Sequence, residues 1–188
     1  GKFGDLLMDI SKDAAMLQFL NNQQNRKKSP NENFAREVME LFTLGRGNYT
    51  ETDVKEAARA FTGWGFNGSG EFVFRPLFHD EGSKTIFGKT GNFTGEDVVD
   101  MLLSNSKTAK FISTKLYRYF VNQKVNPEHV EGLTNRFLRT DGDILEVMEY
   151  VFTQDWFYDP ANIGAQIKSP VELLAGPQRT LQMDLVDK

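Results

Sequence analysis

The chain has 188 residues, 39% hydrophobic and 12% aromatic. This is enough apolar material for a substantial core, so we expect residues 1–188 to form a single domain. The net charge of -4 and a pI near 5.3 exclude a general phosphate-backbone binder, and we expect no nucleic-acid partner. The absence of cysteine excludes disulfides and thiolate zinc sites, and the presence of only two histidines argues against an imidazole metal site.

The first strong helical pattern runs from about Asn31 to Leu44. Steps of about 100° per residue place the apolar side chains of this segment on one broad arc and the polar side chains on the other. The residues of the apolar arc are Phe34, Ala35, Val38, Met39, Leu41 and Phe42. Gly45 suits a left-handed C-terminal cap, so the helix is expected to end there.

Two further helices begin with nearly the same phrase, Gly47–Val54 and Gly91–Val98. In each phrase a threonine, Thr50 or Thr94, can cap free backbone N–H groups, and the aspartate three residues later lies near the positive helix end. We interpret the phrases as one capping solution used twice, because the similarity fades beyond them.

More helices are predicted downstream, at 107–121, 127–139 and 143–153, the last after a cap at Asp141. A final helical pattern starts at Ser169, where a capping box is combined with proline at the first helical position, and continues toward Lys188. Gly176-Pro177 is expected to kink or end this helix.

Between Gly63 and Gly91 helical spacing disappears and glycine is frequent. Short alternating runs at 71–75 and 84–87 suggest a small β-hairpin or ribbon. The predicted fold class is therefore mainly α, a multi-helix orthogonal or bundle-like domain with an irregular hairpin insert around residues 66–90. Functional groups concentrate on loops held by rigid scaffolds, so we place the candidate site in and around the glycine-rich insert, residues 65–92.

The polar face of the 31–44 helix is the first candidate. Glu32, Arg36 and Glu40 form a ladder at four-residue spacing, and Glu37 lies beside it. One interpretation is a solvated face with weak ion pairs. The other is an acidic cleft lining, in which Arg36 holds carboxylates or one carboxylate binds a cation or acts as a base.

His79-Asp80 in the insert is the second candidate, with Lys84 close behind. Such a pair can transfer protons or bind a metal, or the histidine can be held by a local hydrogen bond. Trp64, at a glycine-flanked corner, can stack on a ligand ring such as a sugar or close the core, and we favour the core. Gly88-Lys89-Thr90 is not a phosphate loop, because Ser83 stands where the loop needs glycine.

Taken together, these residues resemble a known bacterial family. The resemblance rests on Pro30–Glu37, Glu40–Gly45, Tyr49-Thr50, Asp53-Val54 and Ala58–Trp64, and further along on Phe72–Phe74, His79-Asp80, Lys84, Gly88, Thr108–Phe111 and Lys168–Glu172. In order and spacing they are similar to the family catalogued as domain of unknown function 1800. The resemblance covers nearly the whole chain, and since family members are longer at both ends, we expect this chain to be a fragment.

The resemblance implies a largely helical protein that is often exported, so an extracytoplasmic location, in the periplasm or at the cell surface, is expected. It implies no reaction or ligand, and so assigns no catalytic residue. No apolar run approaches the roughly 20 residues of a membrane span, and no signal peptide is visible. A signal upstream of Gly1 is compatible with this sequence.

The leading functional hypothesis is a non-enzymatic extracytoplasmic binding or assembly module that contacts a glycan, a peptide or a protein. The alternative is a hydrolase-like enzyme in which His79 and Asp80, with Glu37 or Glu40, activate water, with Mg²⁺ or Ca²⁺ only in this case. The third is a buried polar network that fixes helix order. The candidate residues are Glu32, Arg36, Glu37, Glu40, Arg59, Trp64, His79, Asp80 and Lys84. Oligomeric state is not predicted.

Overall fold

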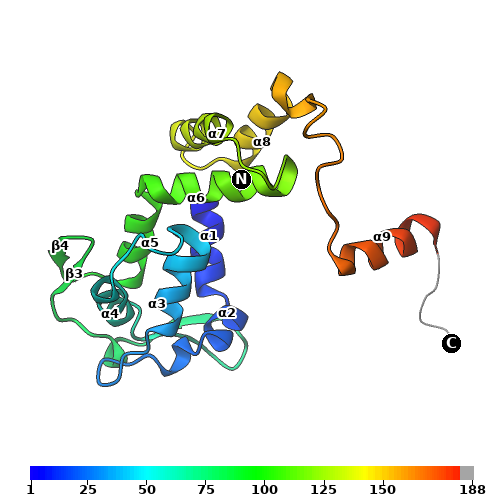
Figure 1. Ribbon diagram of the computed structural model, residues 1–188. Coiled ribbons are helices and arrows are strands. Elements are labelled where there is room, and N and C mark those ends of the chain that lie inside the picture. Colours follow the sequence, from blue (N-terminus) through cyan, green and yellow to red (C-terminus); the bar gives the residue numbers. More distant parts are fainter. Residues whose placement is uncertain (183–188) are drawn as a thin grey trace.

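The computed structural model describes residues 1–182 and has a mainly α fold with two small antiparallel sheets (Figure 1). The helices are α1 (Phe3–Lys12), α2 (Ala14–Phe19), α3 (Asn33–Glu37), α4 (Glu51–Ala60), α5 (Gly95–Leu103), α6 (Ser106–Phe120), α7 (Pro127–Arg139), α8 (Ile144–Phe152) and α9 (Pro170–Leu181). Short helical turns are η1 (Asn22–Gln24), η2 (Val38–Thr43), η3 (Pro76–Phe78) and η4 (Asp155–Tyr158). The predicted fold class is confirmed.

Two hydrophobic clusters form the core. The larger one joins α1–α5 with the strands and includes Phe34, Phe61 and Trp64, and the smaller one joins α6–α8. Phe3 packs against both clusters. Helix α6 lies between α5 and the pair α7–α8 (Figure 1). The aromatic side chains therefore serve mainly as core material, as expected for bulky rings between helices.

The predicted capping chemistry is present at three helix starts. Thr50 and Thr94 each form a capping box with the aspartate three residues later, and Ser169 does so with Glu172. Each box satisfies backbone N–H groups that have no partner inside the helix. Gly45 adopts the expected left-handed conformation, with φ of 76°.

The helix predicted over 31–44 begins later and changes type. It starts as α3 and continues as a π-helical segment, η2 (Val38–Thr43). Thr43 Oγ1 donates to the carbonyl of Val38 at 2.8 Å, and Lys115 Nζ from α6 donates to the carbonyl of Leu41 at 2.7 Å. These side-chain donors occupy carbonyls of the widened turn, a detail that apolar periodicity does not encode.

The insert forms two hairpins instead of one. β1 (Trp64–Phe66) pairs with β2 (Phe72–Phe74), and β3 (Lys84–Ile86) pairs with β4 (Lys89–Gly91). The two runs predicted as strands therefore pair with other segments and not with each other. The second hairpin turns at Phe87 and Gly88, both with positive φ, which is the conformation of a tight two-residue turn.

Two helix ends also differ from the prediction. The cap of α8 is Asp143, whose carboxylate accepts from two backbone N–H groups, while Asp141 takes a left-handed turn conformation before it. α9 continues to Leu181 with Pro177 inside it, so Gly176-Pro177 does not end the helix. The helical pattern expected beyond residue 182 lies outside the described residues. Within them, every helix is too short or too polar to cross a membrane.

Candidate functional site

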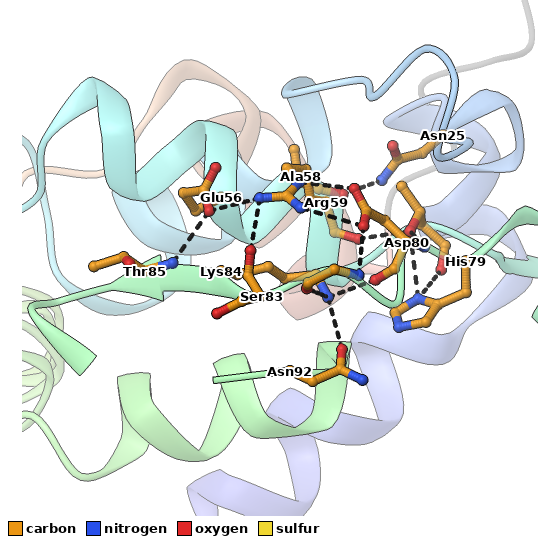
Figure 2. A network of polar contacts seen from close by, with 12 residues as sticks. Asn25, Glu56, Ala58, Arg59, His79, Asp80, Ser83, Lys84, Thr85 and Asn92 are labelled. Atoms are coloured by element: carbon orange, nitrogen blue, oxygen red, sulfur yellow. Dashed lines mark hydrogen bonds and ion pairs between the residues drawn. The ribbon is translucent and has the colours of Figure 1, made fainter. Parts of the chain in front are cut away.

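The insert is bonded to the C-terminal end of α4 through Arg59. Its guanidinium donates to both carboxylate oxygens of Asp80, at 2.7 and 3.2 Å, and to Glu56 at 2.8 Å (Figure 2). It also donates to the carbonyl of Ser83 at 3.1 Å. The hydrogen bonds from Arg59 lower the pKa of Asp80, so Asp80 is held as a carboxylate.

Gly82 makes this close approach feasible. A Cβ at position 82 would stand 2.8 Å from Nη2 of Arg59 and 2.9 Å from Oδ1 of Asp80. Its own N–H donates to the same Asp80 oxygen at 2.8 Å. The glycine is therefore explained by the space that the ion pair occupies.

His79 is buried and bonded to the backbone. Its Nδ1 lies 2.9 Å from the carbonyl oxygen of Thr62, which can only accept, so Nδ1 carries the proton. The ring packs edge-on against Phe74 with centroids 5.3 Å apart. Thr62 Oγ1 in turn accepts from the N–H of Asp80 at 2.8 Å. His79 therefore has the local hydrogen bond that was one of its two predicted roles.

Lys84 is a buried cation, with 1% of its surface exposed. Its ammonium donates to the carbonyl oxygens of Asp80 and Gly82, at 2.5 and 3.1 Å, and to Oδ1 of Asn92 at 3.2 Å (Figure 2). Burial lowers the pKa of Lys84, because it penalises the charged form. The three oxygens occupy all its donors, so Lys84 ties the loop at 80–82 to Asn92, in the segment that leads into α5.

Carboxylates of α4 also bond the backbone of the second hairpin. Glu56 accepts from the N–H of Thr85 at 3.1 Å, and Asp53 accepts from the N–H of Phe87 at 2.7 Å. With Arg59 these residues form a row along α4 that bonds to the segment 80–87, which includes β3. We call this set, Asp53, Glu56, Arg59, His79, Asp80 and Lys84, the insert clamp.

The polar ladder of α3 forms a separate network. Arg36 makes a two-pronged ion pair with Glu51, with both N–O distances 2.8 Å, and a third bond to Glu32 at 3.0 Å. These side chains are more exposed than the clamp, with 68% exposure for Glu51. Arg36 thus pairs with carboxylates, which both interpretations of the ladder allow, and one of these carboxylates comes from α4 and not from the ladder.

Glu40 has partners other than Arg36. It accepts from the hydroxyl of Tyr49 at 2.5 Å and pairs with Arg46 at 2.9 Å. The hydrogen bond from Tyr49 lowers the pKa of Glu40, whereas burial and Glu40 raise the pKa of Tyr49. Glu37 makes no ion pair with any residue from 1 to 182.

The clamp and the ladder contact opposite ends of α4. Glu51, which contacts Arg36, and Arg59, which contacts Asp80, stand eight residues apart (59 − 51), or about 12 Å along the helix axis. The two networks share no hydrogen-bonded residue among those described. Trp64 joins neither of them, since it is 1% exposed and packed between Phe61 and Phe72. Its predicted place in the core is confirmed.

Within residues 1–182, the acidic and histidine side chains nowhere gather in a group of three that is able to hold a metal ion. The clamp can orient a loop and keep it on α4, because each charged group already has an oppositely charged or hydrogen-bonding partner. The sequence missed Glu51 and Glu56 as partners and gave Asp53 only a role at the helix start. Glu51 stands four residues before Lys55, and Glu56 stands three before Arg59, a spacing typical of an ordinary charged helix surface.

A different feature was also missed, an apolar groove of about 610 Å³ between α1, α6 and the start of α8. It is lined mainly by Phe3, Leu6, Ile112, Leu116, Phe120 and Ile144. Two of the lining residues, Leu6 and Tyr119, are 59% and 67% exposed. A contiguous exposed apolar surface of this kind is typical of an interaction site. Its residues come from three segments far apart in sequence, so no local sequence motif predicts the groove.

The fold and the site define a mainly helical domain in which one helix clamps a glycine-rich double hairpin. The family described as Protein of unknown function (DUF1800) matches residues 1–187, and the chain belongs to this family. The resemblance seen in the sequence is thereby confirmed. Among curated proteins no match was found. No solved structure matches the chain either.

Proposed function

We propose that this chain is a non-enzymatic binding or assembly module and that its contact surface is the groove between α1 and α6. The observation that carries the proposal is the apolar lining of this groove together with the exposure of Leu6 and Tyr119. A groove walled by helices suits an amphipathic helix, which lays its apolar face into it. Of the partner classes considered from the sequence, a peptide or protein helix therefore fits best.

The polar motif residues have a supporting role in this proposal. Arg59 is bonded to the carboxylate of Asp80, and Lys84 is bonded to the backbone carbonyl of Asp80. Arg36 and Glu40 are bonded to neighbouring segments. A group that acts as general base must reach a substrate proton, and His79 is 6% exposed with its Nδ1 proton on a backbone carbonyl. This supports a scaffold role over proton transfer.

Binding of a designed amphipathic helical peptide, followed by fluorescence anisotropy, tests the proposal. We expect wild-type protein to bind it and the double variant Leu6→Lys/Tyr119→Lys to bind roughly tenfold more weakly or worse. Both replaced side chains are exposed, so the fold tolerates the change. Leu77→Lys, on the insert and 83% exposed, adds charge of the same kind outside the groove and controls for nonspecific attraction.

Equal binding by wild-type protein and the groove variant would contradict the proposal. So would catalysis: turnover of chromogenic esters, phosphates or glycosides that is lost in a folded His79→Gln variant favours the hydrolase alternative. A melting temperature raised by millimolar Mg²⁺ or Ca²⁺ would favour the metal-dependent form of that alternative.

We also propose an extracytoplasmic location, which the family resemblance supports. Fractionation of cells that express the natural gene tests it. Recovery of the protein with periplasmic or cell-surface markers is the expected result, and recovery with cytoplasmic markers contradicts it.

A further inference from the structure

The C-terminal helix α9 carries an apolar stripe that is exposed in the part of the chain that the structure describes, residues 1–182. Val171, Leu174 and Leu181 are 74%, 65% and 64% exposed. At about 100° per residue they fall within roughly 80° of arc, so they form one face. In Figure 1, α9 stands apart from helices α6–α8 and is joined to them by an extended segment.

A helix like this needs a docking surface. It has 12 residues and contains Gly176 and Pro177, which both weaken a helix interior. Isolated helices of this length are marginal in water, and most helical stability in proteins comes from packing an apolar face. Its capping box at Ser169 fixes the start but covers none of the apolar stripe.

The segment before α9 is fastened beside the groove. Gln166 donates to the carbonyl oxygen of Arg118 at 2.7 Å and accepts from Gln123 at 3.4 Å, and both of these residues line the groove. Only residues 167–169 then separate this anchor from α9. These three residues extend over about 10 Å at most. In Figure 1, α9 lies apart from α1 and α6, the helices that wall the groove.

We infer that α9 of one copy docks in the apolar groove of a second copy, and that the exchange is reciprocal. This inference rests on the proposed function, in which the groove receives an amphipathic helix, and it identifies that helix as α9. Each chain then offers one groove and one helix, so two copies close a twofold pair in which both apolar surfaces are covered. Charge complementarity lies at the start of α9, where Glu172 is acidic and the groove residues Arg118 and Lys115 are basic, while Arg179 in the last turn of α9 is basic as well.

Sedimentation velocity of the 188-residue chain over a wide concentration range tests the inference. Wild-type protein is expected to form a dimer. A helix variant, Val171→Glu/Leu174→Glu, and the groove variant Leu6→Lys/Tyr119→Lys are each expected to weaken dimerisation by roughly tenfold or more. Leu77→Lys is the matched control and should dimerise as wild type does. Circular dichroism checks that each variant is folded.

Mixing the two variants gives the sharper result. The helix variant keeps an intact groove and the groove variant keeps an intact α9, so the mixture regains one of the two contacts and should associate when neither variant does alone. A wild-type chain that stays monomeric at every concentration overturns the inference, as does a dimer that survives both variants. If the chain is monomeric but the groove still binds the designed peptide, only the exchange fails. If the groove binds neither α9 nor the designed peptide, the proposed function fails too.

Discussion

Replacing Arg59 with alanine tests whether the insert clamp holds the fold. The change removes four donor contacts and leaves the carboxylates of Asp80 and Glu56 without their cation. The side chains of Arg59, Glu56 and Asp80 are 26%, 22% and 19% exposed, which places them between a surface pair and a buried pair. Surface pairs contribute about 0–1 kcal/mol, and breaking a buried pair costs about 3–5 kcal/mol.

We therefore expect Arg59→Ala to lose roughly 2–3 kcal/mol of unfolding free energy. For a chain of this length that corresponds to a melting temperature lower by roughly 5–10 °C. Urea unfolding followed by far-ultraviolet circular dichroism measures the loss, and an unchanged m-value shows that the same structure unfolds.

Arg36→Ala is the matched control. Arg36 also makes a two-pronged carboxylate pair and a third bond, but its partners Glu51 and Glu32 are 68% and 36% exposed. We expect less than half the loss seen for Arg59→Ala, because solvent screens the exposed pair. An equal or larger loss for Arg36→Ala would refute the reasoning that burial ranks the two networks.

Three further outcomes follow from contacts of the clamp and of the core. The folded-state pKa of Asp80 is lowered, so its contribution is complete above the ordinary aspartate pKa of about 3.9 and is lost as pH falls through the folded value. The stability gap between wild type and Arg59→Ala should thus shrink in acid titrations, and a constant gap would argue against the ion pair. Lys84→Met should cost about 1–3 kcal/mol by urea unfolding, because three oxygens lose a buried donor, and a neutral result would remove Lys84 from the clamp. Gly95→Ala should cost about 1–3 kcal/mol, since its Cβ would stand only 2.4 Å from Trp64, and full stability would show that the core yields there.

Local chemistry explains which parts of the fold were predictable. The threonine caps at Thr50 and Thr94 and the capping box at Ser169 depend on three or four adjacent residues and were found as expected, and the two threonine caps are full capping boxes as well. The strand pairing was not as expected, because β2 and β3, the two predicted runs, each pair with a segment that has little alternation of its own. Turn geometry, such as the left-handed Phe87, decided that pairing.

The contacts of the site likewise divide into local ones, which the sequence predicts, and long-range ones, which it does not. The sequence placed Arg36 near Glu32, which is a four-residue spacing on a helix, and singled out His79-Asp80 in the insert. It did not pair Arg59 with Asp80, since that contact spans 21 positions and depends on how the loop folds back. The groove could not be predicted from the sequence either, because its walls meet only in the folded chain.

Methyl chemical-shift mapping with the designed peptide tests the central claim most directly. We predict shifts at the groove methyls of Leu6, Ile112, Leu116 and Ile144 in wild-type protein. In Leu6→Lys/Tyr119→Lys the shifts at Ile112, Leu116 and Ile144 should be lost. Methyl groups beside the clamp, such as Ile86, should stay unchanged. Shifts confined to the neighbourhood of the clamp and the α3 ladder, with silent groove methyls, would contradict the account and return the binding surface to the polar motif.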